Sequence, residues 1–195
     1  MRVIELVIDE TQEQVGIDAI SVVEQPAVEI DFIALSKNNK YQLKEVDAEK
    51  RILLGVALVP QKQIYRNDED MGEYYIYFSK DTIRKASELF LKGYNQNNVT
   101  YEHEYPVDGM SVVESWLVDD PKMDKAVKYG YDVPEGTWMI SMKVENDDVW
   151  QSVKAGKVKG FSIEGYFADK LQMKKVSTEE KQLQQLRDLL GYGKK

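Results

Sequence analysis

Short apolar runs, many alternating with polar residues, recur along the chain and predict a protein built mainly from β-strands. Alternation at every second residue is typical of a strand with one buried face, and short continuous apolar runs are typical of strands buried on both faces. The runs of this kind cover residues 1–8, 51–60, 73–78, 136–144 and 157–167. Turn-forming residues separate several of them, as in the NDEDMG stretch. We therefore expect mostly antiparallel strand pairing.

Helix signals interrupt this pattern at three places. Ser79 can cap an amphipathic helix over about 80–92, and Asn146 can cap another that ends near residue 155. A third short helix is predicted within 119–130. Short helices placed among paired strands make the predicted fold class α+β.

The two ends of the chain differ from its middle. Residues 16–37 mix short apolar runs around Pro26, which predicts irregular or edge-strand structure, and the polar residues 38–50 predict a loop. We expect one domain over residues 1–170, partly irregular in its first 50 residues, because this length is enough for a single hydrophobic core. Residues 171–195 are predicted to form a polar linker and an amphipathic helix.

The predicted C-terminal helix covers residues 177–190. Ser177 and Glu180 form a capping box at its start, and a narrow apolar stripe follows at Leu183, Leu186 and Leu190. Two interpretations remain open for this helix. It either folds back over the domain or offers a weak contact surface to a partner, because three leucines bury less area than a stable interface requires.

The stretch TYEHEYPVDGMSVVESW contains His103, the single histidine of the chain. Asp-Gly is the dipeptide that most favours a two-residue hairpin turn, so the sequence predicts a hairpin around Asp108-Gly109. Alternation about that turn places His103 directly opposite Glu114, within reach of a hydrogen bond between the imidazole and the carboxylate. A register slip of one residue would move Glu114 to the other face.

Composition and charge narrow the available chemistry. A formal net charge of −8 without a basic stripe argues against nucleic-acid binding. The acids in the first apolar run do not fit a secretory signal, and no apolar run has the length of a membrane span. Without cysteine there is no disulfide or thiolate, and one histidine cannot build a typical catalytic zinc site. We therefore predict no cofactor and no metal, and reactive groups limited to hydroxyls, carboxylates, lysines and the histidine.

Ser162, in the stretch KGFSIEGYF, is the candidate partner for the histidine. Alternation places Ser162 and Glu164 on one face of the predicted strand, between glycines that permit close backbone approach. A serine hydroxyl is inert near neutral pH unless a base takes its proton and a third group orients that base. Ser162, His103 and Glu114 would supply these three roles.

Taken alone, a histidine or a serine in such a place is more often structural than catalytic. A histidine on an apolar strand face is often a hydrogen-bonded core residue, a serine in a strand is usually structural, and Glu114 could pair with a lysine. The nucleophile elbow of α/β hydrolases is absent, because the spacing between the glycines around Ser162 is one residue too long.

Four blocks of the sequence, taken together, resemble the phage head-maturation proteases of the XkdF-like group. The blocks are GIDAISVVEQPAVEIDFIALSK, VTYEHEYPVDGMSVVESWLVDDP, GTWMISMKV and VWQSVKAGKVKGFSIEGYF, and they occur in the order of the family over about residues 16–167. The resemblance implies the fold of herpesvirus assemblins, a distorted, mostly antiparallel β-barrel surrounded by short helices. In that clan the histidine precedes the serine along the chain, as His103 precedes Ser162 here.

The resemblance implies that Ser162 is the nucleophile and His103 the base. The third member is a second histidine in the herpesvirus enzymes, and this chain has none. The predicted hairpin favours Glu114 for that role, with Glu164 as the fallback.

The implied activity is limited proteolysis inside the phage procapsid, in the host cytoplasm. The implied substrates are scaffold protein, capsid-protein extensions and the protease itself. Self-association is also implied, so the C-terminal helix could contact a second protease copy or scaffold. The competing interpretation is a non-catalytic assembly or scaffold-associated protein that keeps the same fold.

Overall fold

The computed structural model describes residues 2–12, 14–31, 33–36, 49–69 and 71–170. The strands are β1 (Arg2–Val7), β2 (Gly16–Val23), β3 (Ile33–Ser36), β4 (Glu49–Leu58), β5 (Ile64–Asp68), β6 (Gly72–Phe78), β7 (Val99–Tyr101), β8 (Tyr105–Pro106), β9 (Met110–Leu117), β10 (Trp138–Val144), β11 (Gly160–Tyr166) and β12 (Ala168–Asp169). The helices are α1 (Lys80–Lys92), α2 (Lys125–Lys128) and α3 (Asp147–Lys154), with a 3₁₀ turn η1 (Asn95–Asn97).

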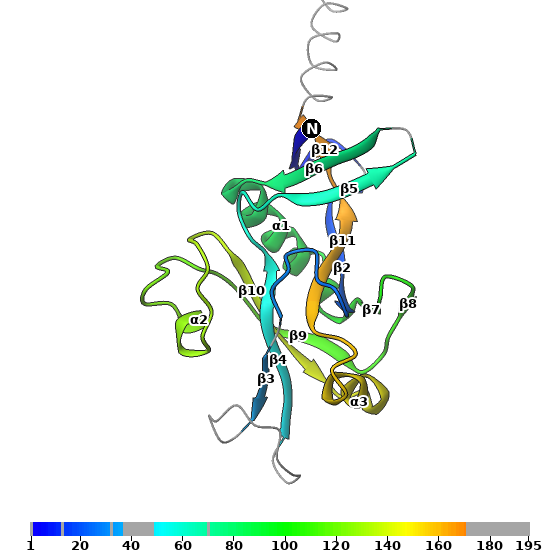
Figure 1. Ribbon diagram of the computed structural model, residues 1–195, viewed down its shortest axis with the longest axis vertical. Helices are drawn as coiled ribbons and strands as arrows, with labels where there is room; N and C mark the ends of the chain where they lie inside the picture. The colour runs from blue at the N-terminus through cyan, green and yellow to red at the C-terminus, as the bar shows by residue number, and fades with distance from the viewer. Residues whose placement is uncertain (1, 13, 32, 37–48, 70, 171–195) are drawn as a thin grey trace, which may run out of the picture.

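The strands form three four-stranded sheets in the orders β12-β1-β6-β5, β3-β4-β10-β9 and β11-β2-β7-β8. The β5–β6 hairpin lies across one end of the molecule, and the other two sheets extend away from it (Figure 1). All pairings among the described residues are antiparallel except β1 with β6 and β2 with β7. The predicted α+β class with mostly antiparallel strands is confirmed. The predicted barrel is not found, because the described strands separate into three sheets and none closes on itself.

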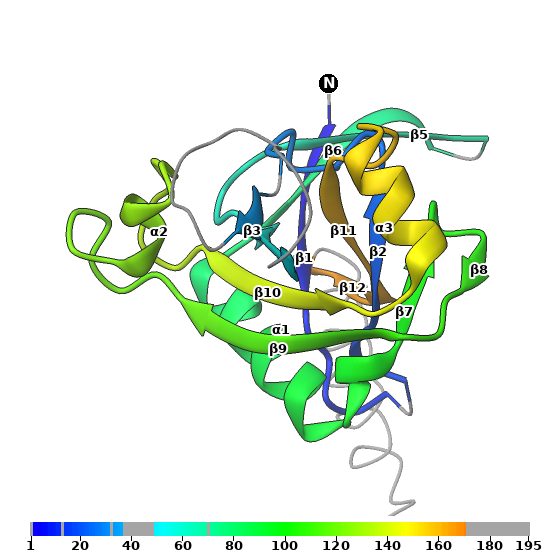
Figure 2. The same ribbon diagram turned by 90° about the horizontal axis from the view of Figure 1, so that it is seen from below.

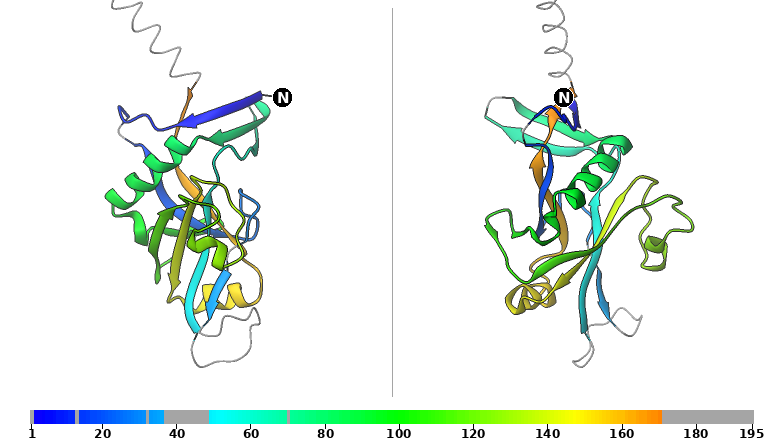
Figure 3. Two further views of the ribbon diagram at one scale, coloured as in Figure 1. Left: turned by 90° about the vertical axis from the view of Figure 1, so that its left-hand side faces the viewer. Right: turned by 180° about the vertical axis from the view of Figure 1, so that it is seen from behind.

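Helix α1 confirms the predicted cap and shows how the sheets are joined. The Ser79 side chain accepts a hydrogen bond from the Thr82 N–H, and Gly93 is the C-cap. Ile83, Ala86 and Phe90 lie on one face and are fully buried, a burial that stabilises the fold by about 1.5–3 kcal/mol for each large apolar side chain. The helix packs obliquely against β2, β9 and β10 (Figure 3). It therefore connects the cores of two sheets.

Strand β2 corrects the prediction for the N-terminal region. Residues 16–23 were expected to be irregular or at an edge, but β2 is an inner strand between β11 and β7. Seven of its eight residues are buried, and only Asp18 is exposed. The expectation was wrong because Pro26 lies beyond the end of the strand and does not disturb its hydrogen bonds. Strand β5 was also not predicted, because its residues are mainly polar.

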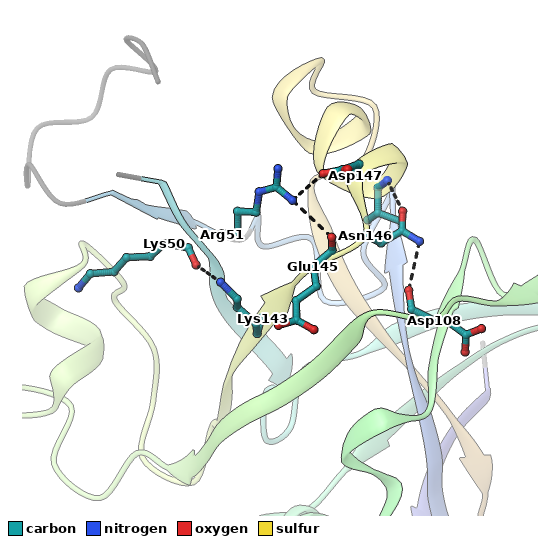
Figure 4. Close-up of polar contacts among 8 residues, drawn as sticks. Lys50, Arg51, Asp108, Lys143, Glu145, Asn146 and Asp147 are labelled. Atoms are coloured by element: carbon teal, nitrogen blue, oxygen red, sulfur yellow. Dashed lines mark hydrogen bonds and ion pairs between the residues drawn. The ribbon is translucent and has the colours of Figure 1, made fainter. Parts of the chain in front are cut away.

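The predicted hairpin around Asp108-Gly109 is wrong. Strand β8 pairs with β7, whereas β9 pairs along its length with β10. The dipeptide instead packs against the start of α3, where the Gly109 carbonyl accepts hydrogen bonds from the N–H groups of Glu145 and Asn146 at 2.7 and 3.2 Å. The Asn146 side chain also donates to the Asp108 carbonyl at 3.1 Å (Figure 4). Gly109 has a φ of 74°, a backbone conformation that favours glycine. This glycine lies at the corner where the chain passes from β8 in one sheet to β9 in another.

The same corner is held from its other side by Arg51 at the start of β4. Its guanidinium donates to the Asp147 carboxylate at 2.7 Å and to the Glu145 carbonyl at 3.3 Å (Figure 4). The predicted Asn146 cap of α3 is confirmed, since its side chain accepts from the Val149 N–H. Helix α3 leads directly into β11 (Figure 2), so this corner fixes where β11 begins.

Three predictions lie partly or wholly outside the described residues. The C-terminal helix at 177–190 and the linker before it fall in the undescribed range 171–195, and most of the predicted loop at 38–50 falls in the undescribed range 37–48. The short helix predicted within 119–130 is confirmed as α2, which covers Lys125–Lys128.

Candidate functional site

Strands β11, β2 and β7 bring three hydroxyl side chains into one row. Ser162 on β11 is paired with Ser21 on β2, and Ser21 is paired with Thr100 on β7. Residues paired across neighbouring strands point to the same face of a sheet, so these three side chains share one face. Glu164 lies two residues after Ser162 in regular register and belongs to that face as well. Phe161, fully buried, lies on the opposite, core-facing side.

His103 lies in a three-residue loop between β7 and β8, where Glu102 and His103 both adopt positive φ, at 52° and 60°. Such angles are uncommon for residues other than glycine and persist only where neighbouring contacts hold them. The loop is fixed to β2 by the Glu102 N–H, which donates to the Val22 carbonyl at 3.1 Å, and by the His103 N–H, which donates to Ser21 Oγ at 3.0 Å. His103 is thus a positioned loop residue, and its predicted place on an apolar strand face is wrong.

Two further contacts close this loop. The Glu102 carboxylate accepts a hydrogen bond from the Glu24 N–H at 2.6 Å. The rings of Tyr101 and Tyr105 stack across the base of the loop, with their centroids 5.6 Å apart. The loop therefore holds the histidine with its side chain 42% exposed, so part of the side chain is accessible.

The imidazole of His103 contacts a carboxylate through one ring nitrogen. His103 Nδ1 lies 3.0 Å from Glu164 Oε1, and the Thr100 hydroxyl donates to the same oxygen. No described residue bonds to Nε2, the other ring nitrogen. A carboxylate on Nδ1 fixes the tautomer that leaves Nε2 as the proton acceptor, which is the arrangement a histidine base requires.

Glu114, the predicted partner of His103, is bonded elsewhere. It lies on β9 in a different sheet, where its carboxylate accepts from Lys125 Nζ at 2.8 Å and from the Ser141 hydroxyl. These two donors, the lysine first, hold the pKa of the Glu114 carboxyl below its ordinary value. The predicted His103–Glu114 contact is therefore not formed, because the hairpin on which it depended is absent. The fallback residue Glu164 makes the contact instead.

Ser162 is 8% exposed, and its hydroxyl has no hydrogen-bond partner among the described residues. Every fully buried side-chain oxygen or nitrogen in the described part of the chain has a partner, so the Ser162 hydroxyl retains access to solvent. The site therefore combines an available hydroxyl and a carboxylate on β11 with an oriented imidazole in the loop between β7 and β8. The described residues hold no cluster of three or more candidate metal-ligating side chains.

The flanking glycines were predicted to allow close backbone approach, and they do so within the chain itself. A Cβ on Gly165 would lie 2.1 Å from the Gly16 carbonyl oxygen, and a Cβ on Gly160 would lie 2.5 Å from the Pro26 ring. The two glycines thus let β11 pack against the first and last residues of the β2 region. They place Ser162 in register with Ser21.

Sequence reasoning missed Ser21, Thr100 and Glu102. Ser21 is fully buried within the otherwise mostly apolar stretch GIDAISVV, and a small polar residue enclosed by such a run is a usable signal of a buried hydrogen bond. Its Oγ accepts from His103 and lies 3.4 Å from the Thr100 carbonyl. Thr100 and Glu102 carry no comparable signal, because their roles depend on the parallel pairing of β2 with β7.

An apolar cavity of about 210 Å³ adjoins the site. Ser162 and its neighbours on β11 form one wall, and residues of β1, β4, β5 and β6 form the others. Arg66 on β5 is the single charged residue among the described residues that line it. A second hollow lies beside Trp116. It is lined by Glu114 and Lys125, so it adjoins the carboxylate of Glu114 and not that of Glu164.

Two proteins of Bacillus subtilis (strain 168) are similar to this chain. One is the phage-like element PBSX protein XkdF, 22% identical over 157 residues, which cover 76% of this chain and 52% of that protein. The other is the uncharacterized protein YqbD, 26% identical over 123 residues, which cover 63% of this chain and 33% of that protein. The chain thus spans about half and about a third of the lengths of these relatives. No solved structure matches.

Among the described residues, no helix is long and apolar enough to cross a membrane. A comparison with protein families matches residues 40–171 to the family described as "Putative phage serine protease XkdF". The matched range covers more than half of the chain and includes His103, Ser162 and Glu164. On that match, the chain belongs to this phage XkdF family.

Proposed function

We propose that the protein is a serine endopeptidase in which Ser162 is the nucleophile, His103 the general base and Glu164 the residue that orients it. The observation that carries this proposal is the 3.0 Å contact between His103 Nδ1 and Glu164, with Glu164 two residues after Ser162 on the same strand face. The family description supports the reaction class.

In the proposed reaction, Ser162 Oγ attacks the carbonyl carbon of a peptide bond while His103 Nε2 takes the hydroxyl proton. A new Oγ–C bond forms, and the imidazolium returns its proton to the leaving amine nitrogen as the C–N bond breaks. Water then attacks the acyl ester, again with Nε2 as the base, and releases the free serine. Throughout, the carboxylate of Glu164 stabilises the imidazolium through Nδ1.

Pre-organisation of the histidine supports this assignment. The positive φ at Glu102 and His103 costs on the order of 1–3 kcal/mol per residue, and the hydrogen bonds to β2 offset that cost. Strain of this kind is commonly held at functional sites, because it keeps a side chain in one orientation. Positive φ at both central residues is also what a type I′ turn between antiparallel strands requires, and here the Glu104 N–H donates to the Tyr101 carbonyl at 3.0 Å across such a turn. The support for the assignment therefore lies in the contacts that hold the turn to β2 and the imidazole to Glu164.

The proposed role of the reaction is limited proteolysis during phage head assembly. Scaffold protein, capsid-protein extensions and the protease itself are the proposed substrates, and the procapsid is the proposed place of action. These assignments rest on the resemblance of the sequence blocks to head-maturation proteases. The alternative is an assembly or scaffold-associated protein without activity.

The first test measures the reactivity of Ser162 with a fluorophosphonate probe, which forms a covalent adduct only with an activated serine. We expect labelling of the wild-type chain at Ser162 and loss of labelling in Ser162→Ala and His103→Ala. Ser152→Ala, which changes a serine on α3, is the matched control and should label normally.

The second test measures cleavage when the same variants are co-expressed with the scaffold and major capsid proteins of the phage element that encodes them. We expect processed products with the wild type and the Ser152→Ala control, and none with Ser162→Ala. Undiminished processing by the Ser162→Ala variant would overturn the proposed nucleophile. Absence of both labelling and processing in the wild type would favour the non-catalytic assembly protein.

A further inference from the structure

The sheet formed by β12, β1, β6 and β5 lies at one end of the molecule and packs on the core with one of its two faces (Figure 1). The core-facing side is marked by three buried isoleucines that pair across the strands, Ile4, Ile76 and Ile64. Side chains of successive residues in a strand point to opposite faces. The neighbouring paired row, Val3, Tyr75 and Tyr65, therefore lies on the other side, which we call the outer face.

The outer face carries a row of apolar and aromatic side chains that the described residues leave partly uncovered. Val3 is 43% exposed, Tyr65 is 45% exposed, and Tyr75 between them is half-buried. The rings of the two tyrosines meet edge to face, with their centroids 5.9 Å apart. The Tyr65 hydroxyl donates to Glu73 at 2.8 Å, so its polar atom already has a partner. Three adjacent strands thus present one apolar row, whereas exposed large apolar residues elsewhere in the described chain lie one or two together.

The described chain ends on this same face. Lys170 follows β12, and its ammonium pairs with the carboxylate of Glu5. Glu5 lies two residues after Val3 on β1, so both side chains point to the outer face. The next six residues, 171–176, span at most about 20 Å when extended, whereas the four strands of the sheet extend over about 14 Å. The segment that follows residue 176 can therefore reach any strand of the outer face.

The segment at residues 177–190 needs an apolar surface. The sequence predicts a helix there, and a helix of 14 residues is marginal in water unless its apolar side packs against something. Its apolar side is a stripe of three leucines, Leu183, Leu186 and Leu190. The stripe is about 10 Å long at 1.5 Å per residue. The row from Val3 to Tyr65 crosses two strand spacings, which is also about 10 Å, so the stripe and the row match in length.

We propose that residues 177–190 form a helix that docks on the outer face of its own chain, with the leucine stripe against the row of Val3, Tyr75 and Tyr65. The size of the contact favours the same chain over a second copy. Three leucines bury on the order of a few hundred Å², which is below the ~1,000 Å² of a stable interface between separate molecules. A short tether raises the effective concentration of the helix to the order of mM, so the same contact forms within one chain first. The inference is independent of the proposed catalytic residues.

The first test uses crosslinking of introduced cysteines, because the natural chain contains none. The full-length variant Val3→Cys/Leu186→Cys is treated with a short bismaleimide, and mass spectrometry identifies the linked peptides. We expect a monomer closed by an internal link between the two positions. The control variant Val113→Cys/Leu186→Cys uses a similarly exposed valine on β9, in another sheet, and should close at least about tenfold more slowly.

Each other outcome of the crosslinking overturns the proposal. Equal closing rates for the two variants, or no closure of either, would mean that the helix does not pack on the outer face. A crosslinked dimer of Val3→Cys/Leu186→Cys in place of the closed monomer would assign the contact to a second copy of the chain.

The second test measures the coupling between the stripe and the row without cysteines. Leu186→Glu places a charge in the stripe and should lower the midpoint of urea unfolding of the full-length chain by about 0.5 M. Gln185→Glu, which changes a residue on the polar side of the predicted helix, is the matched control and should not shift the midpoint. In a Val3→Glu background, Leu186→Glu should cause no further shift, because the contact is already lost. Fully additive shifts would overturn the docking of the stripe on this row.

Discussion

Two carboxylates of this chain have similar surroundings in sequence and different surroundings in space. Glu114 and Glu164 both lie on strands, and both lie near a hydroxyl residue. Glu114 is held by a lysine and Ser141 in one sheet, whereas Glu164 is held by His103 and Thr100 in another. An ammonium group pairs with a carboxylate as a point charge, but an imidazole held at Nδ1 gains a defined proton acceptor at Nε2. The two carboxylate sites thus differ in chemical capacity, because only the site of Glu164 contains an imidazole.

The largest expected effect is on turnover, which should depend strongly on Glu164 and hardly at all on Glu114. Replacing the orienting carboxylate by its amide keeps the shape but removes control of the histidine tautomer, so Glu164→Gln should lower kcat/KM by about 10³- to 10⁴-fold. Glu114→Gln should stay within about twofold of the wild type, since Glu114 touches neither His103 nor Ser162. Steady-state kinetics on one peptide substrate measures both. The reverse order would return the orienting role to Glu114.

This comparison shows which parts of the structure local sequence reasoning could reach. The caps of α1 and α3 were predicted correctly, because a cap depends on residues within one helical turn. The strand containing Ser162 was also correct, because its apolar alternation is local. The hairpin failed although Asp-Gly is a strong turn signal, since β9 gains a longer partner in β10 than β8 could offer.

The candidate site was predictable in its members and only partly in its geometry. His103 stood out as the lone histidine, and Ser162 stood out on the polar face of its strand. The choice between the two glutamates needed the parallel pairing of β2 with β7, which brings Thr100 and the His103 loop to β11. A parallel pairing joins segments distant in sequence and leaves no local turn signature, so the sequence pattern could not supply it.

The next expected effect concerns Ser21, a positioning residue for the histidine loop. Ser21→Ala removes the acceptor of the His103 N–H, which loosens the loop and moves the imidazole. Because displacement of about 1 Å can cost about 10²-fold in rate, we expect kcat to fall by roughly 10- to 100-fold with little change in KM. The loss of kcat at nearly unchanged KM is the readout that a purely structural role would not produce.

A matched control tests whether the Ser21 effect is specific. Ser87 on α1 is similarly buried and donates to the Arg84 carbonyl at 2.8 Å. Ser87→Ala should lower the free energy of unfolding by about 1 kcal/mol without changing kcat. Equal loss of kcat in both variants would mean that Ser21 contributes only to the stability of the folded chain.

A smaller effect is expected at Thr100, which donates to the same Glu164 oxygen as the histidine contacts. Thr100→Val keeps the shape of the side chain and leaves that oxygen with one donor fewer, so the carboxylate is held less firmly. We expect kcat to fall by about three- to tenfold, equivalent to the net value of one hydrogen bond of about 1 kcal/mol. Thr137→Val, which removes a hydroxyl bond to the Pro134 carbonyl, is the control and should leave kcat unchanged.

The smallest expected effect concerns the stability contributed by Glu114. Its side chain is 49% exposed, so replacing it by glutamine should lower the free energy of unfolding at pH 7 by no more than about 1 kcal/mol. Lys125 and then Ser141 lower the pKa of this carboxyl in the folded chain. A lowered folded pKa means that the contribution is present above the ordinary value of 4.5 and is lost as the pH falls through the lower folded value. Urea unfolding of the wild type and Glu114→Gln should therefore show a difference at pH 7 that shrinks steadily below pH 4.5.

In a double-mutant cycle, Lys125→Met should remove most of that difference, because the ion pair is then already broken. A difference that persists undiminished in acid would mean that packing, rather than the charge held by Lys125, determines what Glu114 contributes.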